Sequence, residues 1–155
     1  MIRIFNLTFL VFLFLITKAN SLIEIDITRG NLDPLPIAVS PLFQNDSSKK
    51  NSINELKLEN VGSGISSVVE NNLKTSGLFN PLSKEAFLQK PDIAHLKPRF
   101  EDWALIKAQA LITGKVTIEN KKLKVEFRLW DILAGREMMA LAFTTVPSNW
   151  RRVGP

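Results

Sequence analysis

The sequence contains no cysteine, and its only histidine is His95. Without cysteine the chain can form no disulfide bond, no thiolate zinc site and no cysteine nucleophile. It also has no residue that a lipoprotein anchor could acylate. A metal site would therefore have to consist of carboxylates, and we interpret His95, which lies between two prolines, as a surface residue.

The sequence also has only a small excess of positive charge. The 155 residues contain 20 Lys and Arg against 15 Asp and Glu, a net charge of +5. Arg3 and Lys18 lie in a segment that we interpret below as a signal peptide, so the rest of the chain carries 18 − 15 = +3. Nucleic-acid-binding domains concentrate Lys and Arg on a stripe with aromatic residues, and no such run occurs here. We therefore expect an ordinary solvated surface and no nucleic-acid partner.

Motifs that would indicate catalysis are missing. The serines of residues 63–67 form no Gly-x-Ser-x-Gly elbow, and His95 has no evident acidic partner. Gly62-Ser63-Gly64 lacks the lysine and the preceding strand of a phosphate-binding loop, so we interpret it as a site of helix packing. The sequence therefore predicts a protein that is not an enzyme and has no cofactor or metal.

The charged pairs have structural interpretations. Glu24 and Asp26 face solvent on a predicted strand, and the Glu101-Asp102 pair charges the start of a short helix, where anions are favourable. Arg151-Arg152 after a tryptophan suggests either a cation–π contact or a solvated basic pair, and we favour the solvated pair.

The first twenty-one residues predict export. Arg3 supplies a positive start, and Leu7–Ile16 is an apolar run of ten residues. A membrane-spanning helix needs about twenty apolar residues, so we predict a signal peptide that is cleaved between Ser21 and Leu22, with no stable membrane span afterwards. A lysine close to the cleavage site leaves an uncleaved anchor as the alternative.

Hydrophobic periodicity predicts an α+β domain over residues 22–155. Alternation with a period of two indicates strands, and a spacing of three to four residues indicates helices. The predicted strands are Leu22–Thr28, Ile37–Leu42, Ala108–Ile118, Leu123–Ile132 and Met138–Val146. The predicted helices are Leu58–Ser76, Ser83–Gln89 and Phe100–Lys107, with Arg29–Pro36 as a turn and Lys90–Pro98 as a connector. We expect a single mixed sheet of about five strands with two or three helices on one face and the last three strands as a meander.

Glycines mark both ends of the longest predicted helix. Gly77 follows its last turn, where a left-handed residue commonly ends a helix. Gly62 and Gly64 in its first turns each cost about 1 kcal/mol of helix propensity relative to alanine. Such a cost would be justified if this end of the helix crosses a strand closely.

Three stretches resemble the TolB N-terminal domain family. Ile25–Val39 (IDITRGNLDPLPIAV) resembles its opening strand, glycine turn and second strand, and Val69–Leu82 (VENNLKTSGLFNPL) resembles the end of its long helix. Trp103–Arg152 carries ALITGKV, VEFRLWD and NWRR in the order and spacing of the family.

This resemblance implies a non-enzymatic periplasmic adaptor of the Tol–Pal system, which supports outer-membrane integrity and invagination during cell division. It implies that an N-terminal arm binds the C-terminal domain of TolA. The arm comprises Leu22, Ile23, Glu24, Ile25, Asp26, Ile27, Thr28, Arg29, Gly30, Asn31, Leu32 and Asp33. From the residues alone, Leu22–Thr28 is equally well interpreted as a strand of the domain's own sheet.

The sequence departs from the family at its end. In the family a further helix and a six-bladed β-propeller follow Arg152, whereas this sequence stops at Pro155. The resemblance therefore implies that the propeller's docking site for the lipoprotein Pal is absent. Two alternatives stay open: a nonfunctional fragment of a split or frameshifted gene, and, more distantly, a periplasmic domain that binds a small molecule in an apolar pocket.

Overall fold

A three-stranded antiparallel meander forms the main part of the sheet. The computed structural model describes residues 33–44 and 60–153. Within them β4 (Ala110–Glu119) pairs with β5 (Lys122–Asp131), and β5 pairs with β6 (Arg136–Thr145). The two-residue turn between β4 and β5 has positive φ at Asn120 and Lys121, which matches the twist of a tight hairpin. The meander is confirmed within one or two residues of the predicted bounds.

Short parallel strands complete the sheet on the other side of β4. The strand β1 (Leu35–Val39) lies between β3 (Phe79–Pro81) and β4 and is parallel to both. The strand β2 (Phe43–Gln44) pairs with β4 farther along. The six-stranded sheet has the order β3-β1-β4-β5-β6 with β2 also on β4, which confirms the predicted α+β class with a mixed sheet.

Two features of these short strands differ from our expectation. Pro36 lies inside β1 rather than in a turn, and its carbonyl accepts a hydrogen bond from the N–H of Gln109 at 3.0 Å. The missing N–H is tolerated because Pro36 faces β4 and lies just before the first pair of these strands, Ile37 with Ala110. The strand β3 was not predicted, since three residues are too few to show an alternation. The predicted strand Leu22–Thr28 lies outside the described residues.

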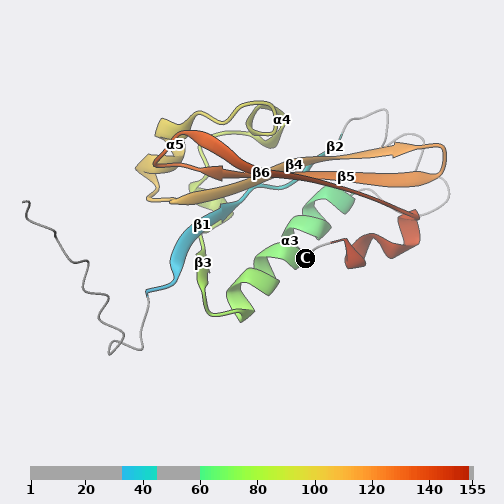
Figure 1. Ribbon diagram of the computed structural model, residues 1–155, viewed down its shortest axis with the longest axis horizontal. Helices are drawn as coiled ribbons and strands as arrows, with labels where there is room; N and C mark the ends of the chain where they lie inside the picture. The colour runs from blue at the N-terminus through green and yellow to red at the C-terminus, as the bar shows by residue number, and fades with distance from the viewer. Residues whose placement is uncertain (1–32, 45–59, 154–155) are drawn as a thin grey trace, which may run out of the picture. The chain divides into compact units, whose positions relative to one another are not determined.

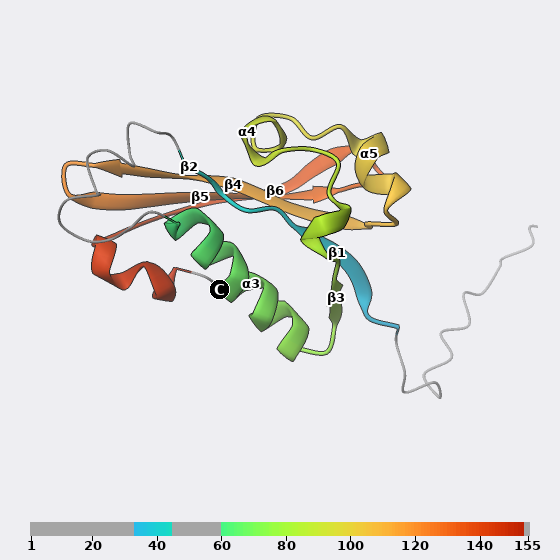
Figure 2. The same ribbon diagram turned by 180° about the vertical axis from the view of Figure 1, so that it is seen from behind.

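The helices cover both faces of the sheet, so our expectation of one covered face is wrong. Figures 1 and 2 show α3 (Val61–Thr75) on one side of the sheet and α4 (Pro91–Ala94) with α5 (Phe100–Leu105) on the other. The long helix begins at Val61 within the described part of the chain. It is followed by Gly77 with φ +72°, which confirms the predicted left-handed cap.

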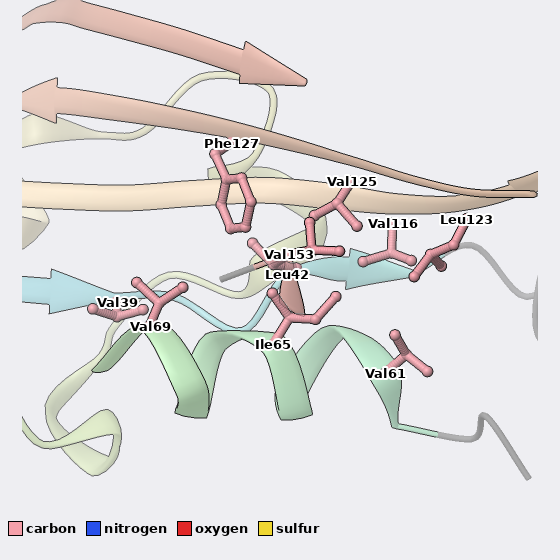
Figure 3. Packing of buried hydrophobic residues seen from close by; sticks show 10 residues of the cluster. All are labelled: Val39, Leu42, Val61, Ile65, Val69, Val116, Leu123, Val125, Phe127 and Val153. Carbon is pink, nitrogen blue, oxygen red and sulfur yellow. The ribbon is translucent and has the colours of Figure 1, made fainter. Parts of the chain in front are cut away.

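The core on the α3 side is aliphatic. Ile65 and Val69 point from α3 toward the strands, where they meet Val125 and Phe127 of β5 (Figure 3). The other members of this buried cluster are Val39, Leu42, Val61, Val116, Leu123 and Val153. The strand β5 contributes the alternate residues Leu123, Val125 and Phe127, as expected for a strand with one face on this core.

The core on the opposite face contains two tryptophans. Trp103 of α5 and Trp130 of β5 are buried together with Leu111 of β4 and Ala94 of α4. Trp130 alternates in phase with the charged residues Lys124 and Arg128 of β5, and it is buried because α5 covers this end of the face. The Trp130 ring N–H donates to the Thr113 hydroxyl at 2.8 Å, which satisfies its polar atom inside the core.

Two segments before α5 differ from the prediction in their helix content. Ser83 caps only a three-residue 3₁₀ turn, Lys84–Ala86, since the chain is extended again at Phe87. The predicted connector Lys90–Pro98 instead contains α4, with Pro91 at its first position, where the missing N–H has no cost. The carboxamide of Gln89 links the region to the core, because its oxygen accepts from the Trp103 ring N–H and from the N–H of Arg99, each at 3.0 Å.

Candidate interaction surfaces

Nearly all of the predicted site residues lie outside the described part of the chain. This holds for the cleavage site Ser21–Leu22 and for the arm from Leu22 to Leu32, and only Asp33 of the arm is described. Asp33 is exposed, and two residues later the N–H of Leu35 donates to the carbonyl of Leu78 at 2.9 Å. The binding role of the arm therefore stays a prediction.

The link between β1 and β2 packs closely against α3. Ser66 of α3 lies between the two ends of the β1–β2 link, since its hydroxyl oxygen accepts from the N–H of Leu42 at 2.9 Å and lies 3.0 Å from the carbonyl of Ser40. Gly62 lies one helical turn earlier, and a Cβ added there would stand 2.3 Å from the carbonyl oxygen of Leu42. The expected close approach at this end of the helix is present at Gly62, but it is to the link between β1 and β2 rather than to a strand.

Gly64 makes a second close approach. A Cβ there would stand 2.7 Å from the ring of Trp150, which belongs to the 3₁₀ helix η2 (Pro147–Arg152). The guanidinium carbon of Arg151 lies 5.1 Å from the centre of the same ring, so the cation–π contact that we had disfavoured is present. Arg151 and Arg152 are both exposed, as expected of a solvated pair.

An apolar hollow lies between α3 and β6 on the face that α3 covers only in part. It has a volume of about 160 Å³ and is lined mainly by Val69, Phe127, Leu129, Met139 and Leu141. Small-molecule sites commonly have volumes of about 300–1,000 Å³ and a few convergent polar groups. This hollow is smaller, and Arg128 is its one charged lining residue, so it does not favour the small-molecule alternative.

On the opposite face the sheet carries ion pairs. The carboxylate of Glu126 lies 3.3 Å from the ammonium of Lys115 and 3.2 Å from that of Lys124. Burial raises the pKa of Glu126, but the hydrogen bonds and charges of Lys124 and Lys115 outweigh this effect and hold the pKa below its ordinary value. Such exposed pairs each contribute about 0–1 kcal/mol to the free energy of unfolding, so they add little to stability.

His95 is more enclosed than a free surface residue. Its ring stacks on Phe43 with centroids 4.4 Å apart, and Nδ1 lies 3.1 Å from the carbonyl oxygen of Pro91. Our surface interpretation of His95 is therefore only partly right, because the residue is half-buried and joins α4 to β2. The pair Glu101-Asp102 lies in the first turn of α5 as predicted, and Asp102 forms an ion pair with Arg99.

The described residues contain neither a cluster of metal ligands nor a membrane-spanning helix. In residues 33–44 and 60–153 no group of three or more histidine, cysteine, aspartate or glutamate side chains could hold a metal ion. Within the same ranges no helix has the length and apolar character to cross a membrane.

The fold and these surfaces define an α+β domain, built on a mixed sheet with helices on both faces. Its exposed features are ion pairs and apolar strips. The chain belongs to the TolB amino-terminal domain family, whose family model matches residues 23–138.

The relatives agree with this assignment. The Tol-Pal system protein TolB of Pelagibacter ubique (strain HTCC1062) is 70% identical over 146 residues, which are 94% of this chain and 33% of that protein. The chain thus spans about a third of the length of this curated relative. The crystal structure of TolB from Acinetobacter baumannii has a TM-score of 0.58 at 19% identity and covers 79% of this chain and 26% of that one. Lipoprotein GNA1162 from Neisseria meningitidis has a TM-score of 0.52 at 18% identity, with 73% and 81% covered, and at this identity both structures show the fold alone.

Proposed function

We propose that this chain is a non-enzymatic periplasmic adaptor of the Tol–Pal system and acts through protein–protein contacts of its N-terminal arm, Leu22–Asp33. The observation that carries the proposal is the 70% identity to a Tol-Pal system protein over 94% of the chain. The proposed partner is the C-terminal domain of TolA. The proposed role is a contribution to outer-membrane integrity and to invagination during cell division.

The described part of the chain supports the arm as the element that binds. The arm continues directly into β1, which is hydrogen-bonded on both sides, to β3 and to β4. Because one end of the arm is joined to a hydrogen-bonded strand, its ordering by a partner costs less conformational entropy than that of a segment free at both ends. The alternation of Ile23, Ile25 and Ile27 with polar residues suits addition to a partner's sheet edge.

Binding is tested with the purified chain, labelled with ¹⁵N and titrated with the TolA C-terminal domain. We expect chemical-shift changes confined to the arm and to the start of β1, and we expect Ile25→Asp to abolish them. Ile93→Asp is the matched control, because Ile93 is an exposed isoleucine of α4, 53% accessible and remote in sequence from the arm. If the titration shifts no resonance, the adaptor role is refuted, and this result favours the alternative of a nonfunctional fragment.

Export is tested separately. We propose that the signal peptide is cleaved between Ser21 and Leu22, so that N-terminal sequencing of the periplasmic protein should begin with Leu-Ile-Glu. A chain that retains Met1 and fractionates with the inner membrane would refute cleavage and leave the binding proposal untouched.

A further inference from the structure

We draw no further inference here: the strongest candidate, the apolar face of β6 that Met139, Leu141 and Phe143 form beside the hollow next to α3, carries nothing because this chain spans about a third of its curated relative and nothing in the structure shows what covers that face.

Discussion

Replacement of Gly62 by alanine provides a test of the packing between α3 and the β1–β2 link. In an unobstructed helix this change stabilises a protein by about 1 kcal/mol, because glycine is the poorer helix former. At Gly62 the new Cβ would stand 2.3 Å from the carbonyl oxygen of Leu42, a backbone atom that cannot rotate away. The two effects have opposite signs, so the sign of the measured change decides between them.

The clash should dominate. Overpacking of a well-packed core costs about 1–3 kcal/mol, and contact with backbone falls at the upper end of this range. Subtraction of the gain of about 1 kcal/mol in helix propensity leaves a net loss of about 2 kcal/mol in the free energy of unfolding. With a urea dependence of about 2 kcal/mol/M, the midpoint should fall by about 1 M.

Urea unfolding followed by tryptophan fluorescence measures this change, since Trp103, Trp130 and Trp150 all lie in the described domain. Ser63→Ala is the control, because Ser63 is the next residue and is exposed. It should be neutral or slightly stabilising. A midpoint of Gly62→Ala at or above that of the original chain would show that the crossing is looser than described, and our reasoning would be refuted.

Two further predictions concern polar groups of the same domain. Ser66→Ala removes the acceptor of the buried Leu42 N–H and should cost about 1–3 kcal/mol, whereas Ser67→Ala, whose bond to the Ser63 carbonyl is exposed, should cost almost nothing in the same urea assay. The pKa of Glu126, followed by carboxyl ¹³C NMR, should lie below its ordinary value of 4.5. Because the pKa is lowered in the folded state, this stabilisation is present above the ordinary pKa and is lost as the pH falls through the folded value, so Glu126→Gln should flatten that part of the stability curve. A pKa at or above 4.5 would contradict the described ion pairs.

The strands of the meander and the long helix followed from local pattern. Each is at least ten residues long, so its hydrophobic period repeats often enough to be recognised. Family membership also followed from the sequence, because matched stretches spread over most of the chain identify a fold before any contact is known. The arm remains a prediction, since it lies outside the described residues.

The arrangement around the sheet did not follow from local pattern. The strand β3 and the helix α4 are three and four residues long, and only their neighbours stabilise them. Pro36 carries a turn signal in isolation and lies in β1 because strands on both sides hold it. Trp130 follows the solvent-facing phase of β5, and it is buried because α5 lies over it.

The sequence by itself determined the fold class, the meander, the long helix with its glycine cap and the family. Each of these can be recognised from patterns within single stretches of the chain. Only the tertiary structure decided that helices cover both faces, that Gly62 lies against the carbonyl of Leu42, and that Trp130 is buried beneath α5. These are properties of residues far apart in sequence, and their contacts depend on which elements lie side by side rather than on the period of any one of them.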